Sequence, residues 1–173
     1  MPTFLHTADI HLDSAFSARF DAERAAQRRH ELIRVVSDMA DIARERDIWL
    51  IAGDLFDGKN VSAETVAFLK RRFSEMPDTQ IFIAAGNHDA FGENSVYARE
   101  DFGSNVHILS TSGECIELPK LNTRIFGASF PDTICRERLN VPVIEKQEGV
   151  FDILLLHADL VANGGESAYN PID

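Results

Sequence analysis

The chain has 173 residues, of which 45% are hydrophobic and 26% charged, the composition of a globular domain rather than of a disordered protein. Its 17 basic and 28 acidic residues give a net charge of −11, which disfavours a uniformly basic nucleic-acid-binding surface but excludes no local one. Because it lacks a membrane-length apolar run, a secretory signal and the cysteines for a disulfide framework, we expect a cytoplasmic protein that enters no membrane.

The first half of the chain alternates short apolar runs with longer amphipathic segments. The short runs are rich in β-branched and aromatic residues and predict strands, whereas apolar positions three or four residues apart predict helices. The predicted elements are strand, helix, strand, helix and strand at residues 3–7, 21–46, 48–52, 62–75 and 81–85. This order predicts parallel strands joined by crossover helices.

The second half begins with shorter elements. Residues 95–102 are compatible with a short helix, and residues 106–109 with a further strand. Residues 114–118 and 123–128 flank the sequence PKLN and predict an antiparallel hairpin.

One strong strand pattern remains near the end of the chain. Residues 151–156 (FDILLL) are almost continuously apolar, which predicts a buried central strand. Residues 131–149 and those after Leu160 are typical of loops. Because no repeat or linker divides the sequence, we interpret residues 1–173 as one α/β domain, and its ending without a final helix or strand looks abrupt.

Polar side chains follow four of the predicted strands, at the point where each strand ends. They are Asp9, His11, Asp54, Asn87, His88 and His157. Because the carboxyl ends of parallel strands face one crevice, we expect these side chains to share one rim. Carboxylate, imidazole and amide groups are ligands for hard or borderline divalent ions. The sequence therefore predicts a metal site at this edge of the sheet.

The spacing of these residues suggests how they would share the metal. Asp9 and His11 lie two residues apart, so in an extended chain both can turn toward one ion. Asp54 has two oxygens and could bridge two ions about 3.5–4 Å apart, the spacing used in two-metal phosphoester hydrolysis. Asn87 offers a neutral oxygen that adds no negative charge.

His88 is the candidate for proton transfer. It directly follows Asn87, so it is not expected to face the same ion and is better placed to donate a proton to a leaving group. Asp89 would then orient the imidazole ring. We interpret Asp57 as a turn residue, with support of the metal ligands as the alternative.

These motifs resemble those of the calcineurin-like metallophosphoesterases. The matching residues are Asp9-x-His11, Gly53-Asp54, Gly86-Asn87-His88-Asp89 and the later His157. The longer strings FLHTADIHLDS, LIAGDLFD and AAGNHD are similar to the SbcD-like branch of DNA repair exonucleases, including its YhaO-type members. The resemblance covers nearly the whole chain and implies a four-layer α/β/β/α sandwich.

The resemblance also implies roles for the site residues. Two metal ions, expected to be Mn²⁺, would be held by Asp9, His11, Asp54, Asn87 and His157, with Asp54 between them. His88 would be the catalytic acid near the scissile phosphate. The implied activity is hydrolysis of DNA phosphodiester bonds, with an SbcC-like ABC-type ATPase as a partner and a homodimer as a further possibility.

The chain departs from the family pattern at two points. Leu156 stands where the fourth motif commonly has glycine. The last motif, Gly-His-x-His, is absent, because no histidine follows His157. We therefore expect these residues to be the N-terminal part of a longer protein and to bind metal weakly on their own.

Two alternative functions stay open. The acidic charge favours a small-molecule phosphatase or a cyclic-nucleotide phosphodiesterase that uses the same metals. The other alternative is a non-catalytic scaffold of this family that only docks a partner. The presence of His88 and Asp89, which a scaffold does not need, argues against it.

Overall fold

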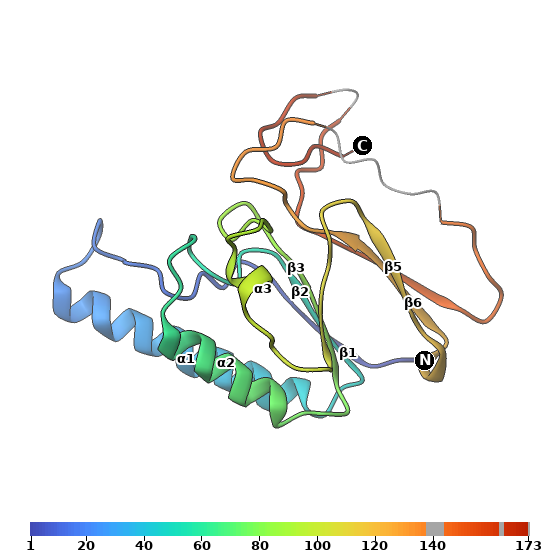
Figure 1. Ribbon diagram of the computed structural model, residues 1–173, viewed down its shortest axis with the longest axis horizontal. Helices are drawn as coiled ribbons and strands as arrows, with labels where there is room; N and C mark the ends of the chain where they lie inside the picture. The colour runs from blue at the N-terminus through green and yellow to red at the C-terminus, as the bar shows by residue number, and fades with distance from the viewer. Residues whose placement is uncertain (138–143, 163–164, 173) are drawn as a thin grey trace.

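A parallel sheet lies at the centre of the computed structural model, which describes residues 1–137, 144–162 and 165–172 (Figure 1). Its strands are β1 (Phe4–Thr7), β2 (Ile48–Ala52), β3 (Gln80–Ala84) and β4 (Val106–Ile108). They are ordered β1-β2-β3-β4, and each neighbouring pair is parallel. The two middle strands are buried on both faces, which explains their continuously apolar sequences.

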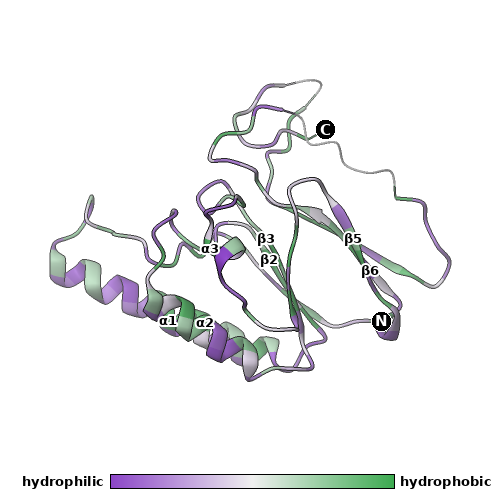
Figure 2. Ribbon diagram, viewed as in Figure 1, coloured by the Kyte–Doolittle hydropathy of each residue, from purple (hydrophilic) through white to green (hydrophobic). Residues whose placement is uncertain are grey.

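Helices cover one face of this sheet. They are α1 (Ala22–Ala43), α2 (Ala63–Ser74) and the short α3 (Val96–Arg99). Both long helices combine hydrophobic and hydrophilic residues along their length (Figure 2). Their apolar sides pack on the sheet in a core that includes Val36, Leu69, Trp49 and Phe73, all fully buried. The side chain of Ser62 caps the first turn of α2 by accepting a hydrogen bond from the amide of Thr65.

A second sheet covers the other face. It contains β5 (Glu114–Leu118), β6 (Thr123–Ala128) and β7 (Phe151–Leu156) in the order β5-β6-β7. The first two strands form the predicted antiparallel hairpin through the 3-10 turn η1 (Pro119–Leu121), and β7 is parallel to β6. Buried side chains of both sheets meet between them: Leu50, Phe82, Ile125 and Leu155. The described residues thus form three layers, of helices, parallel sheet and mixed sheet.

The structure confirms the α/β fold class and the predicted strands and helices of the first half. The fourth layer of the expected sandwich is not seen, since no helix in the described part of the chain covers the outer face of the mixed sheet. The prediction of a central strand at residues 151–156 is wrong. In the described residues β7 pairs with β6 alone, and Leu154 on its outer side is 40% exposed.

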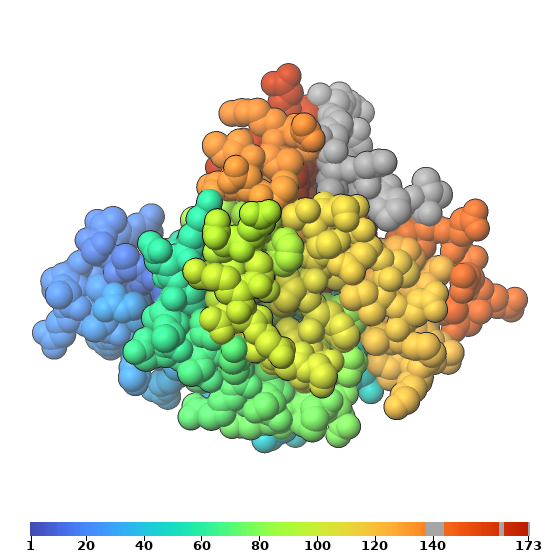
Figure 3. Space-filling model, in the orientation of Figure 1, coloured from blue at the N-terminus to red at the C-terminus, as the bar shows by residue number. Residues whose placement is uncertain are grey.

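Residues 129–137, 157–162 and 165–172 form a prominence beyond the carboxyl ends of the strands (Figures 1 and 3). Isolated bridges hold it together, pairing Cys135 with Tyr169 and Leu160 with Ile172. The loops predicted at residues 131–149 and after Leu160 have no regular helix or strand where they are described, and residues 138–143, 163–164 and 173 lie outside the described residues. No helix in the described ranges is long and apolar enough to cross a membrane.

Candidate metal centre

The loops after β1 and β2 run side by side at the carboxyl edge of the parallel sheet. The amide of Asp9 donates to the carbonyl of Gly53 over 3.1 Å, and the amide of His11 donates to that of Asp54 over 2.9 Å. The bond from Leu12 to Leu55 continues the series. Strand pairing therefore extends into the loops and brings the first two predicted ligand positions beside the third.

Three of these residues have a backbone conformation that is costly for a side chain. Asp9, His11 and Asp54 have φ values of 54°, 55° and 53°, in the left-handed region. The expectation of extended chain between Asp9 and His11 is therefore wrong, because the loop turns at both residues. The hydrogen bonds to the neighbouring loop hold this strained conformation in place. Strain of this kind is concentrated at functional sites.

A further contact anchors the first loop to helix α2. The carboxylate of Asp13 accepts hydrogen bonds from the amide of Ser62 over 2.8 Å and from the hydroxyl of Thr65 over 2.8 Å. Asp13 lies two residues after His11, so this anchor limits the movement of the loop that carries His11.

Two glycines let the loops approach one another closely. Gly53 has a φ of 84°, and a Cβ there would lie 2.6 Å from the Cβ of His157. A Cβ on Gly86 would lie 2.6 Å from the amide nitrogen of Asp54. Any side chain at either position would overlap a candidate ligand residue, so both glycines are needed for the geometry of the site.

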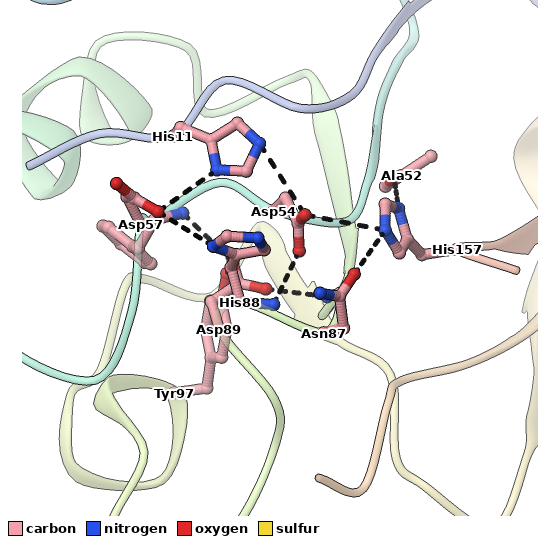
Figure 4. A network of polar contacts seen from close by, with 11 residues as sticks. His11, Ala52, Asp54, Asp57, Asn87, His88, Asp89, Tyr97 and His157 are labelled. Atoms are coloured by element: carbon pink, nitrogen blue, oxygen red, sulfur yellow. Dashed lines mark hydrogen bonds and ion pairs between the residues drawn. The ribbon is translucent and has the colours of Figure 1, made fainter. Parts of the chain in front are cut away.

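Asp54 lies at the middle of the site (Figure 4). Its residue is 3% exposed. One carboxylate oxygen, Oδ2, is 3.7 Å from Nε2 of His11 and 3.6 Å from Nε2 of His157. The other oxygen, Oδ1, accepts a hydrogen bond from the amide of His88 over 3.0 Å. A buried carboxylate between two imidazoles is suited to bind a cation on either side.

The potential ligand atoms fall into two groups that share Asp54. One group is His11, Asp54 and His88, and the other is Asp9, Asp54 and His157; within each group the atoms lie within 4.8 Å of one another. The shared carboxylate agrees with the bridging position expected for Asp54. The grouping differs from the expectation in that Asp9 lies with His157 rather than with His11.

The ring of His157 is held in a defined orientation. Its Nδ1 donates to the carbonyl of Ala52 over 3.0 Å, which leaves Nε2 to face the site. This Nε2 lies 3.2 Å from Oδ1 of Asn87 and near the carboxylate of Asp54. Acceptor atoms of three side chains thus converge, and such a set needs either a proton or a cation between its members. These oxygen and nitrogen ligand atoms therefore suit a divalent metal ion.

His88 is oriented by Asp57. Nδ1 of His88 donates to Oδ1 of Asp57 over 2.8 Å, and the same oxygen lies 3.6 Å from Nδ1 of His11. Burial opposes ionisation of Asp57, but hydrogen bonds from Ser14 and His88 outweigh it and lower the pKa of this carboxyl. In the sequence, the indication for Asp57 was its position three residues after Asp54. That position is equally typical of a turn residue.

Asp89 does not orient His88, so this prediction is wrong. The residue is 4% exposed, and its carboxylate accepts hydrogen bonds from the amides of Gly86 and Phe56, over 2.7 and 3.1 Å. A third bond comes from the hydroxyl of Tyr97 over 2.6 Å. Burial raises the pKa of Asp89, and the three hydrogen bonds oppose this rise only in part. No pattern in the sequence points to Tyr97.

Comparison with known proteins identifies the family of this chain. Residues 2–170 match the family model of the calcineurin-like phosphoesterases. The chain is also similar to an uncharacterized metallophosphoesterase, YhaO of Bacillus subtilis (strain 168), with 28% identity over 185 aligned residues. That alignment covers 98% of this chain and 43% of YhaO, so the chain spans less than half the length of this relative. Because the family match extends over almost the entire sequence, the chain belongs to the calcineurin-like phosphoesterase family.

Proposed function

We propose that this chain carries the metal centre of a two-metal phosphodiesterase that hydrolyses DNA. Its family implies a metal-dependent hydrolase of phosphoesters. The observation that carries the proposal is the buried carboxylate of Asp54, which lies between the imidazole of His11 and that of His157. Two-metal enzymes need one such bridging group between their ions.

The proposed metal ligands are the residues expected from the sequence: Asp9, His11, Asp54, Asn87 and His157. Their oxygen and imidazole donors suit Mn²⁺, which we propose as the ion. The carboxylates of Asp9 and Asp54 meet at this rim, so bound cations would also offset their mutual repulsion. When bound, two such ions stabilise negative charge on a phosphate and generate a nucleophile from water at neutral pH.

The chain itself supplies the proton for the leaving group. Because Asp57 accepts from Nδ1 of His88, the other ring nitrogen, Nε2, is left to hold and deliver a proton. The His88 side chain is 45% exposed, so a substrate can reach it. The ring of His11 packs edge-on against it, with 4.7 Å between centroids, and limits its rotation. His88 is therefore proposed as the general acid.

Replacing Asp57 with asparagine should lower kcat by about ten- to a hundredfold. The amide can still contact the ring of His88, but it no longer favours the protonated imidazole with a negative charge. Steady-state kinetics at saturating Mn²⁺ measures the effect. Asp38→Asn, an exposed carboxylate on α1, is the matched control and should leave kcat unchanged. An Asp57→Asn variant with wild-type kcat would contradict the role of Asp57.

DNA is proposed as the substrate because the strings around Asp9, Asp54 and Asn87 resemble the SbcD-like nuclease branch. The same resemblance supports an SbcC-like ABC-type ATPase as partner and a homodimer. The cytoplasmic location expected from the sequence is also part of the proposal. The net charge of −11 instead favours a small phosphoester. The experiment therefore has to compare substrate classes.

The test uses the protein as its gene encodes it, stripped of metal with a chelator. Adding MnCl₂ should restore hydrolysis of linear duplex DNA and of bis(p-nitrophenyl) phosphate, with no turnover in the chelator. Activity on p-nitrophenyl phosphate or on cyclic nucleotides without any on DNA would replace the nuclease with the small-molecule alternative. Absence of Mn²⁺ binding in a calorimetric titration would favour the scaffold.

A further inference from the structure

The buried carboxylate of Asp89 connects the two loops that carry most of the site. Its Oδ1 accepts from the amide of Gly86, which begins the loop with Asn87 and His88. Its Oδ2 accepts from the amide of Phe56, in the loop between Asp54 and Asp57. One side chain thus sets the separation of the two loops from below the site (Figure 4).

Tyr97 contacts this carboxylate on the side that faces away from the candidate metal ligands (Figure 4). Its hydroxyl donates to Oδ2 of Asp89 over 2.6 Å, the shortest of the three bonds to that carboxylate. Tyr97 is 5% exposed, and its ring packs against Phe56 and Phe102 at centroid distances of 5.6 and 6.4 Å. Burial and the charge of Asp89 raise the pKa of Tyr97, so its hydroxyl stays protonated and remains a donor.

A continuous series of contacts leads from Tyr97 to the proposed general acid. The hydroxyl contacts Asp89, the carboxylate contacts the amide of Phe56, and the next residue, Asp57, accepts from His88. The first loop holds the same segment through two backbone bonds, from the amide of His11 to the carbonyl of Asp54 and from the amide of Asp57 to the carbonyl of Leu12 over 2.8 Å. The bond from Phe56 to Asp89 adds a further restraint directly before Asp57.

We propose that Tyr97 is a positioning residue, which acts through Asp89 to keep Asp57 aligned with His88. The proposal rests on the proposed hydrolysis, in which His88 is the acid. Removing the hydroxyl leaves a buried carboxylate oxygen short of a donor, and such an oxygen is costly in a buried site. The carboxylate would then shift, the bond to Phe56 would weaken, and Asp57 would lose its alignment with the ring.

The decisive variant is Tyr97→Phe in the protein as its gene encodes it, because it removes one oxygen and keeps the packing. With bis(p-nitrophenyl) phosphate and saturating Mn²⁺, we expect kcat to fall about tenfold, the lower end for a residue that orients a site group. KM should stay within about twofold. Tyr169→Phe, at a tyrosine that is 44% exposed, is the control and should match the wild type.

A second measurement does not depend on activity. Amide hydrogen exchange at Phe56 and Gly86 should become about tenfold faster in Tyr97→Phe, while the amides of β2 and β3 stay protected. If Tyr97 were only a packing residue, exchange would either stay unchanged or accelerate throughout the core. Either of these results, or a wild-type kcat for Tyr97→Phe, would overturn the proposal.

A double variant tests whether Tyr97 acts through Asp89 or independently of it. Asp89→Asn should lower kcat at least as much as Tyr97→Phe, and the double variant should lose no more than Asp89→Asn alone. Additive losses would show that the two residues act separately and would contradict the series. If the wild type hydrolyses no phosphodiester, the proposed function fails, and the exchange experiment still decides whether Tyr97 holds the two loops.

Discussion

Replacing Asp54 with asparagine should lower kcat/KM for phosphodiester hydrolysis by about a thousandfold or more, which corresponds to about 4 kcal/mol of transition-state stabilisation. Asparagine has the same shape, and its Oδ1 can still accept from the amide of His88. It lacks the second anionic oxygen that lies between His11 and His157. The variant therefore keeps the fold while removing the group shared by both ion positions.

The same variant should separate metal binding from folding. Mn²⁺ at a hundred times its Kd stabilises a folded protein by about 2.7 kcal/mol, or about 5–10 °C in the unfolding midpoint of a chain of this size. Asp54→Asn should lose this increase, and its metal-free midpoint should not fall, because a buried charge is removed. The control is Asp78→Asn, an exposed carboxylate before β3. A full Mn²⁺-induced increase in Asp54→Asn would exclude Asp54 as a shared ligand.

The convergence of the six candidate residues could be predicted from the sequence. Five of them follow β1, β2 and β3, and parallel strands in register place their carboxyl ends at one edge. The sixth, His157, follows β7 of the second sheet, so its approach depends on the packing of the two sheets and not on this register. The register also explains why Asp9 and His11 lie beside Asp54. What the pattern could not provide is the left-handed backbone of these loops. That conformation depends on hydrogen bonds to a loop more than 40 residues away in the sequence.

The partner of His88 shows a second limit. Asp89 is its neighbour in the sequence, but its carboxylate is directed at the amides of Gly86 and Phe56. Asp57, on another loop, makes the contact to the ring. Sequence proximity therefore predicts the wrong carboxylate, because consecutive side chains in a turn point in different directions.

The last strand shows a third limit. A continuous apolar sequence indicates burial on both sides, yet in β7 only the side with Leu155 packs against the parallel sheet. Leu154 lies on the opposite side and is 40% exposed in the structure. An apolar sequence on both sides of a strand therefore does not show whether the strand is central or at an edge. That depends on the order of the strands in the sheet.

Gly86→Ala should damage the site through a single methyl group. The added Cβ would lie 2.6 Å from the amide nitrogen of Asp54 and 2.8 Å from its Cγ, distances that no packed pair of atoms tolerates. The loops must then separate, which weakens the bond from the amide of His88 to Asp54. We expect a loss of about 1–3 kcal/mol in unfolding free energy from overpacking, and about a hundredfold in kcat/KM from misplaced groups.

Gly92→Ala provides the matched control, because a Cβ at Gly92 meets no atom within 4 Å. It should leave the unfolding midpoint, the Mn²⁺ affinity and kcat/KM close to the wild-type values. Thermal unfolding with and without Mn²⁺ distinguishes the two variants, since Gly86→Ala should lower the metal-free midpoint and also reduce the increase that Mn²⁺ produces. Both effects follow from one steric contact, because the methyl group would overlap Asp54. Either the two loops move apart or the shared carboxylate changes position. Wild-type stability and metal affinity in Gly86→Ala would mean that Asp54 does not need this close approach, and the geometry proposed for the metal centre would be wrong.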